Sequence, residues 1–118
     1  MMTPDLCAQH ARVLFKKDTG YSNKTDKQLD KEICESLIGT TYPVASELWN
    51  LINPAEVEAL LNAHINHLFW ALLFIKCYCT EPILTRVVGG VDATTFRTWV
   101  WLFLEQIQVL KLRVVSYV

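Results

Sequence analysis

The feature that most constrains the fold is an apolar stretch from His67 to Leu110 that is divided by helix-capping and helix-breaking residues. Its first part, His67–Cys79, contains Leu, Ala and Lys, which favour helices, and neither Gly nor Pro, so it is predicted to be helical. Thr80 and Pro82 then predict the start of a short helix ending near Val88, because Thr caps helices and Pro is tolerated in their first turn.

The next break falls at Gly89-Gly90, since glycine adopts positive φ at low cost. Asp92 follows and is predicted to cap a longer helix from about Ala93 to Leu110. A helix, a short helix, a tight glycine turn and a long helix form the element order of a helix-turn-helix unit, in which the last helix enters the major groove of DNA.

Weaker helical patterns cover much of the remaining chain, with polar or turn-forming residues between them. The helices predicted from these patterns are Pro4–Lys17, Lys27–Ile38, Pro43–Leu51 and Ala55–His64, the last capped near Asn53. The apolar sides predicted for the first and third of them are Leu6, His10, Val13 and Leu14, and Val44, Leu48, Leu51 and Ile52.

These patterns predict an all-α fold, a small helical domain of about five to seven helices containing a helix-turn-helix-like unit. We expect a partly flexible N-terminal extension at residues 1–32, the helical domain at 33–112 and a C-terminal tail at 113–118. Val114, Val115 and Tyr117 favour extended structure in that tail. The residues expected to form the core are Trp49, Leu68, Phe69, Leu72, Leu73, Phe96, Val100, Phe103 and Ile107.

The charge balance argues against strong unspecific binding to nucleic acid. The chain has 118 residues with 11 Lys and Arg against 12 Asp and Glu, and a net charge of −1. Proteins that bind nucleic acid mainly through phosphates are strongly basic. From Lys76 to Val118, however, five basic residues stand against three acidic ones, so the C-terminal part carries a slight positive excess.

The cysteines and the apolar runs indicate a reduced, intracellular and soluble protein. Cys77 and Cys79 are two residues apart in a predicted helix and point in different directions, so no disulfide framework is expected. The longest apolar run, Leu68–Ile75, is too short to span a bilayer, and no membrane partner is expected. No signal peptide is predicted, because polar residues interrupt the first apolar ones.

Three groups of landmark residues, spread over residues 33–112, resemble a known family. They are Thr41, Pro43, Leu48 and Trp49; then Leu68, Trp70, Ala71, Leu72, Lys76, Tyr78 and Glu81; then Gly90, Val91, Asp92, Thr95, Phe96, Arg97, Trp99, Val100, Trp101 and Phe103. In this order they resemble the N-terminal region of PIF/Harbinger-like transposases of the DDE superfamily, in the versions found in algae and protists.

The resemblance implies a DNA-binding helix-turn-helix module that acts in the nucleus. In that family a catalytic RNase H-like domain lies further along, where three acidic residues hold two divalent metals. Such chemistry needs clustered carboxylates, and beyond Leu110 this sequence has no Asp or Glu. We therefore expect no enzymatic activity, no cofactor and no small-molecule substrate. The family tends to have a second basic residue where this chain has Thr98.

The residues expected to contact DNA lie mainly at the start of the long helix and on the helix before it. They are Arg97, Thr94, Thr98, Arg86, Lys76 and Lys111. Arg97 can read a guanine edge, and the threonines can contact a phosphate or a thymine methyl group. The alternative interpretation is that Arg97 is a solvated surface residue and that Thr94 only starts the helix.

The tryptophans could have more than one role. Trp70, Trp99 and Trp101 could stack on bases, but the helix is apolar nearly all round, which favours a core or a partner surface. We expect an apolar patch that meets another domain or subunit. The alternative function is therefore a helical protein-interaction module, or a decayed transposase fragment that no longer binds DNA.

The histidines and cysteines do not predict a metal site. His64 and His67, with the two cysteines ten or more residues further along the chain, lack the ligand spacing of the common zinc fingers, so no metal is expected.

Overall fold

The computed structural model describes residues 2–19, 25–54, 57, 60, 62–77, 81–88 and 91–116; for 16–19, 81, 82, 87 and 111–116 it describes the backbone alone. The elements in chain order are α1 (Pro4–Thr19), α2 (Asp26–Glu32), the π-helical turn η2 (Ile33–Leu37), α3 (Tyr42–Ile52), α4 (Ile65–Cys77), α5 (Glu81–Val87) and α6 (Ala93–Ser116). No strand occurs in this described part, and the predicted all-α fold is confirmed.

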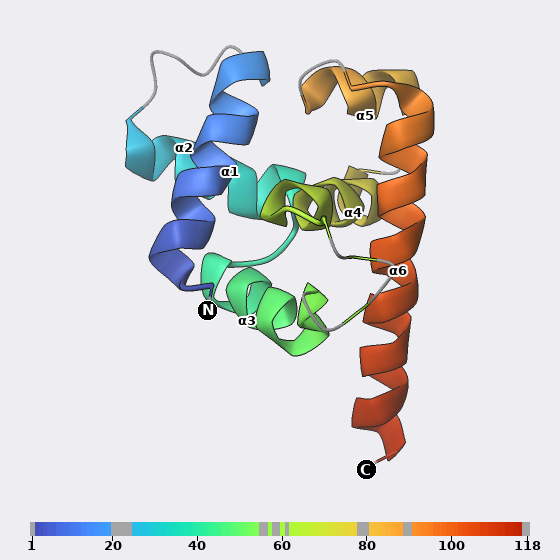
Figure 1. Ribbon diagram of the computed structural model, residues 1–118. Coiled ribbons are helices and arrows are strands. Elements are labelled where there is room, and N and C mark those ends of the chain that lie inside the picture. Colours follow the sequence, from blue (N-terminus) through green and yellow to red (C-terminus); the bar gives the residue numbers. More distant parts are fainter. Residues whose placement is uncertain are drawn as a thin grey trace.

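Helix α4 lies in the middle of the molecule, between α1 on one side and α6 on the other (Figure 1). Its central position follows from its sequence, because a helix that is apolar on nearly every side must be covered on every side. The run from Leu68 to Leu73 is buried throughout. The largest side chains packed around it are Phe15 of α1 and Phe96 and Phe103 of α6, which are at most 1% exposed.

The predicted core is largely correct. Seven of the nine residues named for it are buried, and the other two, Trp49 and Ile107, are partly buried against the same cluster. The predicted starts of α5 and α6 are also correct within one residue. Asp92 caps α6 as expected: its Oδ2 accepts hydrogen bonds from the backbone N–H groups of Thr94 at 3.1 Å and Thr95 at 3.2 Å. The predicted break at residues 89–90 lies outside the described residues, as do Thr80 and Cys79.

The N-terminal residues belong to this core, so the expected boundary after residue 32 does not coincide with a break in the packing. Helix α1 contacts α3, α4 and α5, and its Cys7, Ala11 and Phe15 are completely buried. The apolar side predicted for it is wrong in part: Leu14 is buried, but Leu6 is 43% and Val13 is 73% exposed. The small residues Cys7 and Ala11 lie on the contact side together with Leu14 and Phe15.

The same error affects α3. Val44 and Leu51 were expected to face inward but are 53% and 59% exposed, whereas Ala45 and Ser46 are buried. Thr41 caps this helix through a 3.5 Å hydrogen bond from the Val44 N–H to its Oγ1. The buried side of α3 combines these two small residues with Tyr42 and Ile52, so the prediction is correct for Ile52 and wrong for Val44 and Leu51.

The α-helix predicted from Ala55 to His64 is corrected at residues 57, 60 and 62–64, which are not α-helical; residues 55, 56, 58, 59 and 61 lie outside the described residues. Asn53 does not begin a helix: it ends α3 in the left-handed conformation, with φ of 50°. Asn tolerates this conformation better than most residues. The N–H groups of Val57, Leu60 and Ala63 then each bond to the carbonyl three residues earlier, at 3.1, 2.9 and 3.0 Å, which is the 3₁₀ pattern.

The C-terminal tail also differs from expectation, because α6 remains helical through Ser116 instead of ending near Leu110. Its last turns project beyond α3 (Figure 1). The β preference of valine is a weak tendency that the continuing helix overrides. No helix in the described residues has both the length and the apolarity needed to cross a membrane.

An ion pair and a further hydrogen bond join α1, α2 and α3. Arg12 of α1 donates two hydrogen bonds to the Asp30 carboxylate of α2, from Nε at 2.8 Å and from Nη2 at 2.6 Å. The hydroxyl of Tyr42, at the start of α3, donates a third at 2.9 Å. The hydrogen bonds from Arg12 hold the pKa of Asp30 below its usual value, and burial raises the pKa of Tyr42.

Candidate nucleic-acid interface

The candidate DNA-reading helix, α6, is fixed by one apolar side. Phe96, Val100 and Phe103 follow one another at helical spacing and are 1%, 2% and 0% exposed. The Trp70 ring of α4 lies against Phe96 at a centroid distance of 5.6 Å, and Trp49 of α3 stacks on Phe103 at 5.9 Å. These contacts fix the buried side of α6 against α3 and α4 and leave its opposite side exposed.

Three of the predicted DNA contacts lie on that opposite side. Thr94, Arg97 and Thr98 are all exposed, and positions three and four apart share one helix face. The Thr98 hydroxyl donates a 2.8 Å hydrogen bond to the Thr94 carbonyl, which satisfies its proton and leaves its oxygen able to accept a hydrogen bond. The first two turns of α6 therefore present one guanidinium and two small amphipathic side chains on one face.

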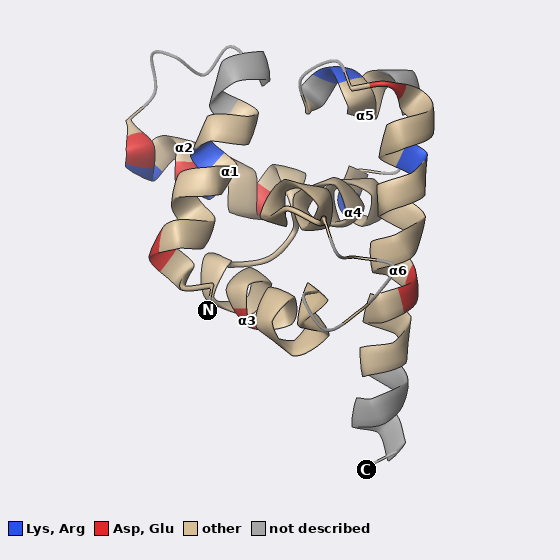
Figure 2. Cartoon of the chain, in the orientation of Figure 1, with Lys and Arg blue, Asp and Glu red and all other residues tan. Residues whose placement is uncertain are grey.

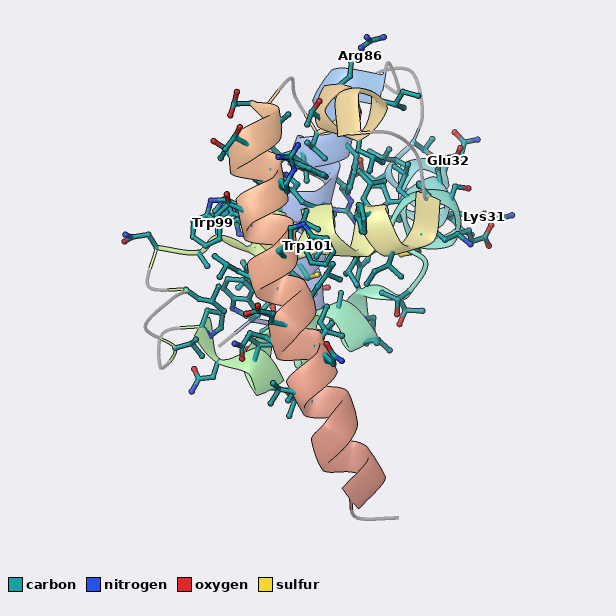
Figure 3. All side chains as sticks on the ribbon, turned by 90° about the vertical axis from the view of Figure 1, so that its right-hand side faces the viewer. Lys31, Glu32, Arg86, Trp99 and Trp101 are labelled. Atoms are coloured by element: carbon teal, nitrogen blue, oxygen red, sulfur yellow. The ribbon has the colours of Figure 1, made fainter. Side chains whose placement is uncertain are left out.

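Arg86 lies at the same end of the molecule. It belongs to the last turn of α5, which packs against α6, and its side chain extends away from the body of the protein (Figure 3). Helix α5 and the start of α6 both lie at the upper end in Figure 1. The structure thus groups Arg86 with the exposed N-terminal turns of α6.

Lys76 and Lys111 are placed differently. Lys76 is exposed in the last turn of α4, where its aliphatic stem runs beside Gly39, in the turn that follows η2. Lys111 lies on the helical backbone of α6, and its side chain is outside the described residues. It is 14 residues beyond Arg97, which at 1.5 Å per residue is about 21 Å along the axis. Neither lysine belongs to the group formed by Arg86 and Arg97.

The surrounding charges limit the strength of this group. Lys and Arg are distributed over several helices rather than gathered into one continuous basic face (Figure 2). Glu105 is exposed two turns beyond Arg97 on α6, and the Asp92 carboxylate already accepts two of the first N–H groups of the helix.

One of the three tryptophans that were expected in a core or on a partner surface is exposed. Trp101 is 56% exposed, whereas Trp70 is buried and Trp99 is partly buried. Trp99 and Trp101 point to different sides of α6 (Figure 3). The ring of Trp101 rests on Phe74 of α4 at 6.3 Å. Trp101 follows Arg97 by four positions, so an aromatic surface continues the polar face of the first two turns.

The histidines serve a structural purpose. His64 and His67 both accept backbone hydrogen bonds at the start of α4, whereas Cys77 lies ten residues further, about 15 Å along the same helix. One metal ion could not reach both ends. Among the described residues, no group of three or more His, Cys, Asp or Glu side chains is arranged to hold a metal.

Comparison of the chain with protein-family models, with curated proteins and with solved structures finds no match.

Proposed function

We propose that this protein binds duplex DNA through the first two turns of α6, with α5 beside them. The observation that carries the proposal is the placement of Thr94, Arg97 and Thr98 on one exposed face of a helix whose opposite face is buried. A helix held in this way can place its exposed face in the major groove. There a guanidinium can read guanine, and threonine can contact thymine or a phosphate.

In this proposal Arg97 reads a base edge and Arg86 contacts the backbone. Each phosphate contact contributes about −0.9 to the slope of log affinity against log salt concentration. Two or three contacts give a slope of about −2 to −3, which is shallow for a DNA-binding protein. The module would correspond to the DNA-binding part of a Harbinger-like transposase, acting in the nucleus without catalytic activity of its own.

Fluorescence anisotropy with a labelled random-sequence duplex at 20, 50 and 150 mM salt tests the proposal. The wild type is compared with Arg97→Ala and with Lys31→Ala, which removes the same charge from an exposed site on α2 (Figure 3). Saturable binding that weakens with salt, falls about tenfold in Arg97→Ala and is nearly unchanged in Lys31→Ala supports it. Equal losses in both variants would mean unspecific charge attraction and would contradict it.

A second function, association with another protein chain, is favoured by the exposed apolar side chains Ile75, Ile83 and Trp101 on α4, α5 and α6. Surfaces of this kind mark protein contacts when they are contiguous. Sedimentation over a hundredfold concentration range tests it, with Trp101→Ala compared with Val13→Ala, a change at an equally apolar exposed site on α1. Self-association that only Trp101→Ala removes would favour this function.

A further inference from the structure

Two histidine side chains accept hydrogen bonds from backbone N–H groups at the N-terminus of α4. His64, the residue before the helix, accepts a hydrogen bond at its Nδ1 from the Asn66 N–H at 3.1 Å. His67, three residues later, accepts the N–H of His64 at its own Nδ1, at 2.9 Å. This reciprocal arrangement is a capping box, in which two otherwise free backbone donors are satisfied.

The same chain contains a capping box made from residues that cannot be protonated. At the start of α2, Thr25 Oγ1 accepts the Gln28 N–H at 3.3 Å, and Gln28 Oε1 accepts the Thr25 N–H at 3.1 Å. The two boxes share one geometry and differ in chemistry. An imidazole nitrogen accepts a hydrogen bond only while it is unprotonated, whereas a hydroxyl or an amide oxygen accepts at any physiological pH.

The histidine box lies where three helices meet. The His67 ring stacks on Trp99 of α6 with a centroid distance of 4.0 Å and an angle of 2° between the planes. It also touches Trp70 of α4 edge-on at 4.7 Å. On the other side, His64 contacts His10 of α1 edge-on at 4.9 Å. The box therefore connects the start of α4 to both α1 and α6.

We propose that His64 and His67 form a proton-sensitive capping box, which holds the start of α4 against α1 and α6 while both rings are neutral and releases it when they are protonated. Protonation turns each Nδ1 into a donor that faces another donor, so both cap hydrogen bonds are lost. It also places positive charge at the positive end of the α4 dipole. This device is a property of the fold and does not depend on DNA binding.

The charged groups around the box reinforce this behaviour. On α1 the titratable group that faces the box is His10. On α6 the side chain that faces His67 is Trp99, which does not titrate, and within α4 the two histidines face each other. Burial lowers the pKa of His67 to about 4, with a further contribution from His64. Burial also lowers the pKa of His64, helped by His10. In the described part of the chain, the charges that act on these two rings are those of histidines.

The pH window follows from these values. The pKa of His67 is lower in the folded chain than the ordinary 6.5. The unfolded chain therefore binds the extra proton between pH 6.5 and about 4, and stability is full above pH 6.5 and is lost as the pH falls toward 4. For His67 the two pKa values give a rise in the unfolding equilibrium constant of up to about 30-fold between pH 7.5 and pH 5.

The test combines two measurements from pH 7.5 to pH 4.5: the thermal midpoint by circular dichroism and the histidine resonances by NMR. The wild type is compared with the double variant His64→Ser with His67→Gln, which rebuilds the box in the chemistry of α2, and with Gln108→Ala, at an exposed uncharged residue of α6, as the control. We expect the wild type to lose stability below pH 6.5, the double variant to lose several-fold less, and Gln108→Ala to follow the wild type closely. We also expect the His67 resonance to titrate well below pH 6.

The proposal is overturned if His64 and His67 titrate near pH 6.5, or if the double variant keeps the acid sensitivity of the wild type. The NMR titration needs only the wild-type chain, so it decides the matter even if the double variant does not fold. Asp30 does not confuse the result, because its pKa lies below 3.8 and it remains ionised throughout this range.

Discussion

The contact between Arg12, Asp30 and Tyr42 allows a quantitative prediction for Asp30→Ala. This change removes three hydrogen bonds, all of them to an ionised carboxylate. The Arg12 and Asp30 side chains are 30% and 25% exposed, so solvent screening reduces their contribution below that of a fully buried pair. Tyr42, only 9% exposed, would also lose its acceptor. Together these losses amount to about 2–3 kcal/mol of the free energy of unfolding.

Urea denaturation at pH 7 measures this loss directly. The expected decrease corresponds to a fall in the thermal midpoint of roughly 8–12 °C for a chain of this size. Glu47→Ala, at an exposed acidic residue of α3, serves as the control and should change the free energy of unfolding by less than about 0.5 kcal/mol. A loss below about 1 kcal/mol for Asp30→Ala, or equal losses in both variants, would refute the contact's role in joining the three helices.

The acid dependence of the same contact has a defined sign. Asp30 has a lowered pKa when folded, mainly because Arg12 donates to its carboxylate. Its stabilisation is therefore present above about pH 4 and disappears as the pH falls through the folded pKa. The wild type should lose this contribution in acid, and Asp30→Ala, which has no carboxylate to protonate, should show a smaller decrease over the same range.

Three further changes test the packing. Phe103→Ala should cost about 3–5 kcal/mol by urea denaturation, because the ring is fully buried and stacks on Trp49; a cost below 2 kcal/mol would contradict its place in the core. Trp101→Ala should change stability by less than about 1 kcal/mol by the same measurement, since over half of the side chain is exposed. Gly39→Ala should lower the thermal midpoint through a cost of about 1–2 kcal/mol, because φ is +69° and the new Cβ would lie 3.0 Å from Lys76 Cδ; an unchanged midpoint would show that this turn relaxes freely.

Helix-capping residues and uninterrupted apolar runs predicted much of the fold. The uninterrupted apolar run predicted α4, and Asp92 correctly marked the start of α6, because a capping residue acts on its immediate neighbours. The apolar sides of α1 and α3 could not be predicted in this way. Leu6 and Val44 are larger than Cys7 and Ala45, yet the small residues form the contacts, since which side is buried depends on how closely another helix approaches.

The candidate site was predictable in part for the same reason. The exposure of Thr94, Arg97 and Thr98 follows from the helix period once the apolar positions are known. The same period also places Trp101 on that face, one turn from the exposed Thr98 and Glu105, although its apolar ring alone suggested a core or a partner surface. The histidine box did carry a local signal, two histidines three positions apart at the start of a helix, which is the spacing of a capping box.

The most direct test of the proposed DNA binding is to locate the contact by NMR. Backbone amide shifts of the isotopically labelled protein are recorded while a short duplex is added at low salt. DNA binding through α6 predicts that the largest changes fall at Thr94, Arg97, Thr98 and Arg86 and that they disappear in Arg97→Ala. Changes centred elsewhere, or none at millimolar duplex, would contradict it.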